Sequence, residues 1–196
     1  MRIYIRHADK EYKNGNSEVY KHDPGITNES MMFCQLKCDE MIIKYGIPLA
    51  IVCSPYKRTR ETAIYMAQHL KMRYKIDVLL KYDIRLSEYL GNQKSDDIDV
   101  TEETKKYNPP HPESFHQMDS RVRWHNDMFR DLDFQNEIVW FITHGLIINR
   151  ISNSMGFKLP HRIPCLTSVS FSSTILNTEE LTICEIGSGN VYMTVV

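Results

Sequence analysis

The chain has 196 residues, of which 42% are hydrophobic and 25% are charged, and its net charge is −1. This length suits one well-cored domain, and we expect a single domain over residues 1–196. The near-neutral charge argues against a nucleic-acid-binding surface or one that binds acidic membranes. No run of about 18 apolar residues occurs, so we expect no transmembrane helix.

The cysteines and the N-terminus bear on the compartment. The chain has five cysteines, an odd number without paired short spacing, which fits a reducing compartment better than a disulfide framework. Met1-Arg2 leads directly into the first predicted strand, so we expect no removable leader segment. A cytoplasmic protein is therefore expected.

The first half of the chain alternates predicted strands with predicted helices. Short continuous apolar runs predict buried strands, and apolar residues spaced three or four positions apart predict helices. Turn-forming residues mark the connections, such as Gly46-Ile47-Pro48 after the first helix. In chain order we expect a strand at 2–6, a loop at 9–25, a helix from Thr27 or Asn28 to about Tyr45, a strand at 49–53, a helix from Arg58 to about Lys71 and a strand at 76–80.

The second half begins with a polar stretch and ends with strands. Residues 91–112 are polar and charged and end in Pro109-Pro110-His111-Pro112, which predicts a long loop. We expect a lid or insertion region over about 89–118. Gly187-Ser188-Gly189-Asn190 is a hairpin signal between the last two strands. In chain order we expect a helix from about Glu113 to Leu132, a strand at 138–143, a helix from Leu146 to about Met155, and strands at 167–174, 181–186 and 191–195.

This alternation predicts the α/β fold class. Strands that alternate with helices form a mostly parallel sheet with helices on both faces, which gives a three-layer α/β/α sandwich. The strand-rich tail adds antiparallel strands at or near one edge. We therefore expect a mostly parallel, mixed sheet.

Polar residues follow the predicted strands of the alternating part. Arg6-His7-Ala8 follows the first strand, and the segment 54–63 follows the second. Leu86-Ser87-Glu88 comes after the third strand and Thr143-His144-Gly145 ends the fourth. Because sites in open α/β sheets lie outside the carboxyl ends of the strands, these segments are expected to build one site.

The side chains of this site suit phosphoryl transfer. Arginine guanidinium groups hold phosphate oxygens with charge-assisted, often bidentate hydrogen bonds. A neutral imidazole can attack phosphorus and carry the phosphoryl group covalently. A carboxyl group can protonate the leaving oxygen and later deprotonate the attacking water.

The same segments resemble the histidine phosphatase superfamily, which is also called phosphoglycerate-mutase-like. Its Arg-His-Gly element is matched by Arg6-His7-Ala8, and its acidic element by Leu86-Ser87-Glu88 with Gly91. The Ser-Pro, Arg and Thr-Ala element matches Ser54-Pro55, Arg58 and Thr62-Ala63, and the late His-Gly element matches His144-Gly145. The four elements occur in the family's order over residues 2–145, so the resemblance implies the histidine-phosphatase fold.

The resemblance also implies a role for each matched residue. His7 would be the nucleophile that forms a phosphohistidine. Arg6, Arg58 and His144 would bind the phosphoryl oxygens, and Glu88 would be the general acid and then the general base. No metal or other cofactor is implied, because cationic side chains take the place of magnesium.

The sequence departs from the family pattern around the nucleophile. Ala8 replaces the usual glycine, which requires that its backbone avoid positive φ. The mutase pattern after the histidine is absent, and Asp9, Lys10 and Glu11 stand there instead, which favours hydrolysis. Lys10 occupies the place of a basic residue in the branch of tyrosine-phosphatase-like regulators of T-cell-receptor signalling. It is expected either to bind substrate phosphate or to lie in solvent.

Other residues near the motifs have competing structural interpretations. Asp83, Asp96 or Asp97 could replace Glu88 as the proton donor. Glu113 and Ser114 could border the pocket or cap the next helix. A structural interpretation is preferred for the remaining residues. We expect Ser54 to be a helix cap and Arg60 to be a solvated or ion-paired side chain. Cys34 and Cys38 are expected to be core residues rather than half a metal site, and His111 and His116 to be surface residues.

Three functions remain open from the sequence. The leading one is a metal-independent phosphatase that hydrolyses phosphomonoesters of small molecules or phosphoproteins through a phosphohistidine. The second is a phosphomutase or sugar bisphosphatase with the same intermediate. The third is a catalytically weak module that binds phosphorylated ligands. Neither the substrate nor the oligomeric state follows from the sequence.

Overall fold

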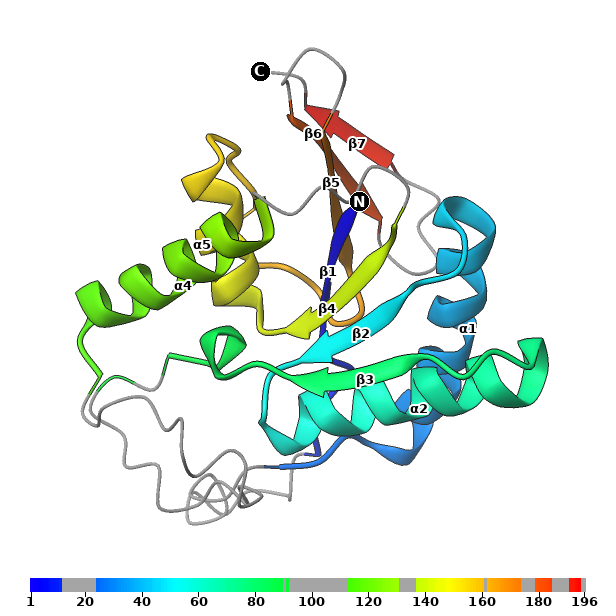
Figure 1. The fold of residues 1–196 in the computed structure, drawn as a ribbon. Helices are drawn as coiled ribbons and strands as arrows, with labels where there is room; N and C mark the ends of the chain where they lie inside the picture. The colour runs from blue at the N-terminus through cyan, green and yellow to red at the C-terminus, as the bar shows by residue number, and fades with distance from the viewer. Residues whose placement is uncertain are drawn as a thin grey trace.

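The computed structural model describes residues 1–11, 24–89, 91, 113–130, 137–160, 162–173, 179–184 and 191–194. The elements and the connections between them are drawn in Figure 1. The strands are β1 (Arg2–Arg6), β2 (Ala50–Cys53), β3 (Leu79–Tyr82), β4 (Val139–Thr143), β5 (Ser168–Ser173), β6 (Glu179–Cys184) and β7 (Val191–Thr194). The helices are α1 (Asn28–Tyr45), α2 (Lys57–Tyr74), the short 3-10 helix η2 (Ile84–Leu86), α4 (Phe115–Arg130) and α5 (Gly145–Ser154).

The strands form one sheet of mixed direction. Its seven described strands follow the order β3-β2-β4-β1-β5-β6-β7. The first four of this order pair in parallel, and β5, β6 and β7 continue the sheet in antiparallel pairs. This arrangement confirms the predicted mixed sheet with antiparallel strands toward one edge. The residues between β6 and β7, where the hairpin signal lies, are outside the described part of the chain.

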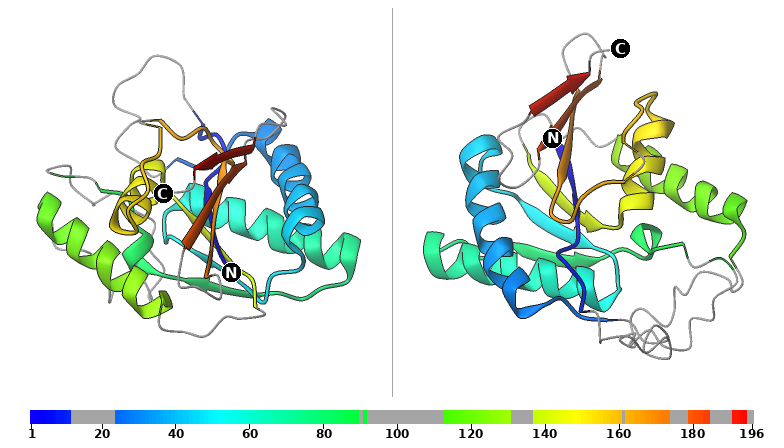
Figure 2. Two further views of the ribbon diagram at one scale, coloured as in Figure 1. Left: turned by 90° about the horizontal axis from the view of Figure 1, so that it is seen from above. Right: turned by 180° about the vertical axis from the view of Figure 1, so that it is seen from behind.

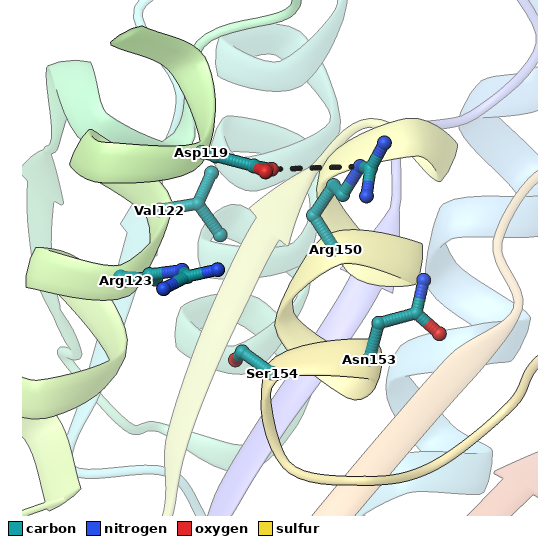
Figure 3. Close-up of a pocket in the computed structure, with 6 residues that line it drawn as sticks. All are labelled: Asp119, Val122, Arg123, Arg150, Asn153 and Ser154. Carbon is teal, nitrogen blue, oxygen red and sulfur yellow. Dashed lines mark ion pairs between the residues drawn. The ribbon is translucent and has the colours of Figure 1, made fainter. Parts of the chain in front are cut away.

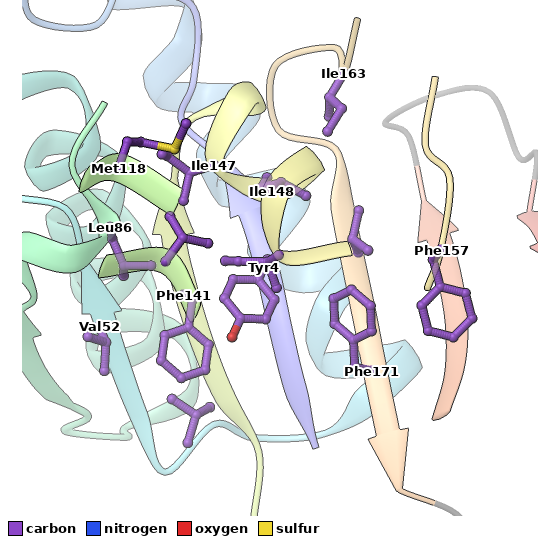
Figure 4. Close-up of a cluster of buried hydrophobic side chains, with 14 of the residues drawn as sticks. Tyr4, Val52, Leu86, Met118, Phe141, Ile147, Ile148, Phe157, Ile163 and Phe171 are labelled. Atoms are coloured by element: carbon purple, nitrogen blue, oxygen red, sulfur yellow. The ribbon is translucent and has the colours of Figure 1, made fainter. Parts of the chain in front are cut away.

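Different helices cover the two faces of the sheet. Successive strand residues point to opposite faces, and Ile3 and Ile5 of β1 belong to an apolar cluster with Cys38 of α1 and Met66 of α2. Tyr4, between them, belongs to the second cluster, which includes residues of α4 and α5. Figure 2 shows α1 and α2 on one side of the sheet and α4 and α5 on the other. Figure 4 shows the second cluster, with the rings of Tyr4, Phe141 and Phe171 along the strands. The three-layer α/β/α architecture is confirmed.

The third strand begins later than predicted. Helix α2 runs to Tyr74 and ends at Lys75, whose φ of 62° is left-handed. Ile76 and Val78 pack against the cluster under α2 as partly buried side chains, but strand pairing with β2 starts only at Leu79. The apolar run at 76–80 therefore reflects packing below the helix as much as strand formation.

The other predicted elements agree with the structure to within two or three residues at their ends. Thr27 caps α1, and its side chain accepts a hydrogen bond from the backbone N–H of Ser30. Most of the predicted lid region, including 92–112, lies outside the described residues, as does the end of the predicted helix at Leu132. None of the described helices combines the length and the apolar character that a membrane crossing requires.

Candidate active site

The parallel strands bring the predicted site residues to one edge of the sheet. Arg6 of β1 is in register with Thr143 of β4, and Cys53 of β2 is in register with Ile142. The residues after β1 and β2 are held by two further backbone hydrogen bonds to β4. The backbone N–H of His7 donates to the Thr143 carbonyl at 2.9 Å, and that of Ser54 donates to the Ile142 carbonyl at 2.9 Å. The three strand ends therefore present their next side chains side by side.

His7 is buried and is held in one orientation by its own backbone neighbour. Its Nδ1 lies 2.6 Å from the carbonyl oxygen of Ala8. Because a carbonyl can only accept, Nδ1 carries the hydrogen and Nε2 keeps a free lone pair. Burial is the main cause that lowers the pKa of His7 to about 3, and the positive charges of Arg58, Arg6 and Lys10 also lower it. The hydrogen bond to the Ala8 carbonyl is the one influence that raises this pKa, and it is outweighed. The imidazole is therefore neutral at physiological pH.

His144 lies directly beside His7 and is fully buried. The two ring centroids are 5.3 Å apart, with the rings edge to face. Arg58 Nη2 lies 3.4 Å from Nδ1 of His144, and Ser54 Oγ lies 3.0 Å from its Nε2. Since the guanidinium can only donate, Nδ1 accepts and Nε2 donates to the Ser54 hydroxyl. Burial, followed by the charge of Arg58, lowers the pKa of His144 well below its usual value.

Arg58 connects the second histidine to the predicted acid. It lies in the first turn of α2, almost entirely buried, and its Nη2 donates to Oε2 of Glu88. That carboxylate oxygen is 3.7 Å from His144 Nδ1. The ring of Tyr56 lies under the guanidinium at 4.8 Å and also contacts the His144 ring edge to face. A cation over an aromatic face is held by the ring quadrupole, so Tyr56 helps to fix Arg58.

Arg6 is fixed by a turn that the sequence did not single out. Its Nη1 donates to the carbonyl of Ile163, and its backbone bonds both to Leu166 and to Thr167. Leu166 has a left-handed φ of 58°, which is a strained conformation for a branched residue. Among the described residues, Arg6 Nε has no hydrogen-bond partner. The backbone of the 163–167 turn thus determines where the guanidinium of Arg6 lies.

Ala8 meets the requirement that the sequence placed on it. Lys75 and Leu166 are the only described non-glycine residues with positive φ, so Ala8 avoids that region. Its backbone N–H donates to Thr62 Oγ1 at 3.1 Å, and the Thr62 hydroxyl donates to the Arg58 carbonyl at 2.7 Å. Thr62 therefore links the loop after His7 to the first turn of α2.

Two of the structural interpretations are resolved by the geometry. Ser54 does not cap α2: the N-cap position is Tyr56 and has no side-chain cap, while the Ser54 hydroxyl contacts His144 and accepts from the N–H of Tyr56. Ser114 does cap α4, since its hydroxyl accepts from the N–H of Gln117 while the Gln117 side chain accepts from the N–H of Ser114. Glu113 is buried, and its two carboxylate oxygens accept hydrogen bonds from Arg121.

Several other candidates form contacts apart from those that join His7, His144, Arg58 and Glu88. Asp83 is buried against His125 and Arg85, and Cys34 and Cys38 pack in the core below α1. Lys10, three residues after His7, forms an isolated backbone bridge with Ile26. His116 is exposed on α4, Arg60 is half-buried on α2, and His111, Asp96 and Asp97 lie outside the described residues.

A separate pocket lies between α4 and α5 (Figure 3). It is lined by Asp119, Val122, Arg123, Arg150, Asn153 and Ser154. Arg150 is paired with Asp119 across it at 3.6 Å. None of the histidines or arginines at the strand ends takes part in this pocket. Over the described part of the chain, no group of three or more His, Cys, Asp or Glu side chains could hold a metal ion.

The fold and the grouping of these residues define a class of protein. The chain belongs to the histidine phosphatase superfamily (branch 1), whose profile matches residues 3–180. A search of curated protein sequences gives no match.

Solved structures share the fold at low sequence identity. YhfR of Bacillus stearothermophilus is 17% identical with a TM-score of 0.59, covering 99% of this chain and 95% of its own. The mycobacterial glucosyl-3-phosphoglycerate phosphatase is 16% identical with a TM-score of 0.58, covering 99% and 98%. The ecdysone phosphate phosphatase of Bombix mori, solved with tungstate, is 14% identical with a TM-score of 0.66, covering 87% and 88%.

Proposed function

We propose that the protein is a phosphatase that hydrolyses phosphomonoesters through a phosphohistidine on His7, without a metal ion. The observation that carries this proposal is the 2.6 Å contact between His7 Nδ1 and the Ala8 carbonyl. It leaves the lone pair of Nε2 available, and the low pKa of the imidazole keeps that nitrogen unprotonated. A neutral, oriented imidazole is the form that attacks phosphorus.

The surrounding cations supply the electrostatic part of the reaction. Arg58 and the unpartnered Nε of Arg6 would hold the phosphoryl oxygens and stabilise the charge that develops on them in the transition state. The Nε2–H of His144, which donates to Ser54, could instead donate to a phosphoryl oxygen. These donors are buried, so they act where water does not screen them.

Glu88 would move the protons. In the first step Nε2 of His7 forms a bond to phosphorus, the bond from phosphorus to the leaving oxygen breaks, and the Glu88 carboxyl protonates that oxygen. In the second step water attacks the phosphohistidine, the carboxylate takes the proton of the water, and the P–N bond breaks to release phosphate.

The test is hydrolysis of 4-nitrophenyl phosphate in EDTA, together with trapping of an acid-labile phosphoenzyme. His7→Asn keeps a donor to the Ala8 carbonyl but has no nucleophilic nitrogen, so turnover and phosphoenzyme are both expected to disappear. His69→Gln is the matched control, because His69 pairs with Asp39 between α1 and α2 rather than at the strand ends. Activity that survives in His7→Asn, or that EDTA abolishes in the wild type, would refute the proposal.

A further inference from the structure

The segment that carries Glu88 is held by three contacts, one from β4 and two from α4, before it reaches the site. It runs from Asp83, the residue after β3, through η2 to Glu88. Within it, Leu86 and Ser87 are fully buried. From β4, the Thr143 hydroxyl donates to the Leu86 carbonyl at 2.7 Å. Because this segment leads directly into Glu88, the remaining contacts that hold the segment set the position of Glu88.

One of these contacts is a buried pair between helix α4 and Asp83. His125 is fully buried, and its Nδ1 lies 2.8 Å from Asp83 Oδ2. The other oxygen of this carboxylate accepts from the backbone and the Nε of Arg85, both at the start of η2. On its far side, His125 Nε2 lies 3.2 Å from the hydroxyl of Tyr4. A neutral imidazole that donates to Asp83 and accepts from Tyr4 leaves none of these polar atoms unsatisfied.

The second contact comes from the preceding turn of the same helix. Arg121 is four residues before His125, so both side chains leave the same face of α4. Its Nη1 donates to the Arg85 carbonyl at 2.7 Å, while its Nε and Nη2 donate to the two carboxylate oxygens of Glu113 at 2.6 and 3.0 Å. Glu113 itself is buried, so a bidentate pair fixes Arg121 and directs its Nη1 toward the segment.

We infer that α4 is the positioning element for the general acid, with His125 and Arg121 as positioning residues that hold the 83–87 segment so that Glu88 reaches the leaving oxygen. This inference rests on the proposed function and deepens it. A general acid acts only within hydrogen-bond reach of the atom that it protonates. A displacement of about 1 Å, caused by a change remote from the chemistry, can cost about 100-fold in rate.

The test compares two substrates that differ in their need for a proton. Phenyl phosphate releases a strongly basic phenolate, and 4-nitrophenyl phosphate releases a weakly basic one. His125→Leu removes the donor to Asp83, and kcat/KM for phenyl phosphate is expected to fall about 10- to 100-fold. For 4-nitrophenyl phosphate the expected loss is less than about 3-fold, because that leaving group needs little help from an acid. His116→Leu, on the exposed side of the same helix, should change neither value.

Conservative replacements separate positioning from folding. His125→Asn places an amide donor near the position of Nδ1, so it should restore the phenyl phosphate rate at least partly. Arg121→Lys keeps the charge but cannot serve Glu113 and the Arg85 carbonyl together, so it should show the same selective loss. If His125→Leu does not fold, these two variants carry the test, with folding checked by urea unfolding.

Each outcome bears on one proposal. An equal loss on both substrates, or no loss on either, would overturn the positioning role and leave the buried pair as a packing feature. A wild type that forms no phosphohistidine, or a His7→Asn variant that keeps its activity, would instead refute the proposed function. Phosphoenzyme trapping in the His125 variants distinguishes these cases, because His7 and the site cations are unchanged in them.

Discussion

The neutral state of His7, the proposed nucleophile, predicts a specific loss of stability in acid. In the folded protein, burial and then the charge of Arg58 lower the pKa of His7 to about 3. In the unfolded chain the ordinary value of about 6.5 applies. Between these two values only the unfolded chain binds a proton on this residue. The free energy of unfolding therefore rises with pH, and the contribution of His7 is lost as the pH falls below about 6.5.

The magnitude follows from the two pKa values. At pH 5 the protonation of His7 in the unfolded chain is nearly complete, and it favours unfolding by about 2 kcal/mol relative to pH 8. This is a large share of the roughly 5–15 kcal/mol by which native proteins are stable. The pKa values of His144 and His125 are also lowered, mainly by burial, so both act in the same direction.

The assay is urea unfolding at pH 8 and pH 5 in buffers without phosphate, for the wild type and for His7→Asn. Asparagine does not titrate but can still donate to the Ala8 carbonyl. The difference between the two pH values should be about 2 kcal/mol smaller in the variant. His116→Asn, at an exposed site on α4, should behave as the wild type. The same pH dependence in the wild type and in His7→Asn would mean that folded His7 titrates normally, which would refute the neutral-nucleophile argument.

Three further predictions concern the site and one helix end. Arg58→Lys should lower kcat/KM for 4-nitrophenyl phosphate by about 100- to 1000-fold, since lysine cannot reproduce the guanidinium geometry, whereas Arg60→Lys on the same helix should have little effect. Glu88→Gln keeps the size of the side chain but not the proton, so kcat/KM should fall more for phenyl than for 4-nitrophenyl phosphate. A uniform fall would contradict its role as the acid. Lys75→Gly should raise the free energy of unfolding by about 1 kcal/mol, because it relieves a left-handed φ at the end of α2. Lys71→Gly, inside that helix, should lower it by about 1 kcal/mol, and urea unfolding measures both.

The part of the site that sequence reasoning could locate is the part delivered by strands. His7, Arg58 and His144 each follow a short apolar run, and the parallel pairing rule brings such strand ends together. The sequence predicts the place of Ser54 after β2, but its predicted role as a helix cap is wrong, because a serine before a helix usually caps it whereas this hydroxyl contacts His144. Only the position of the His144 ring, fixed by a partner 90 residues away, shows that the hydroxyl is used there.

The supporting contacts could not be found in the same way because they depend on packing between distant segments. His125 and Asp83 are 42 residues apart, and Arg6 meets the Ile163 carbonyl across 157 residues. One signal was available for His125: it shares the apolar face of α4 with Met118 and Val122, both buried. A histidine in such a row is either satisfied by a partner or excluded from the core. The turn at Leu166 offered no signal, since nothing in its local sequence favours a left-handed residue.

The two helical layers hold different parts of the candidate chemistry. On the α2 side, Thr62 joins the backbone of Ala8 to that of Arg58, so the proposed nucleophile and the proposed phosphate-binding arginine share one support. On the α4 side, His125 and Arg121 hold the segment that leads to Glu88. The ion pair between Arg58 and Glu88 is where the two supports meet. A change in the α4 layer can therefore displace the acid while the nucleophile keeps its place, because the bonds that orient His7 come from the strand ends and from α2. This separation is the physical reason that leaving-group dependence, rather than overall activity, distinguishes the two layers.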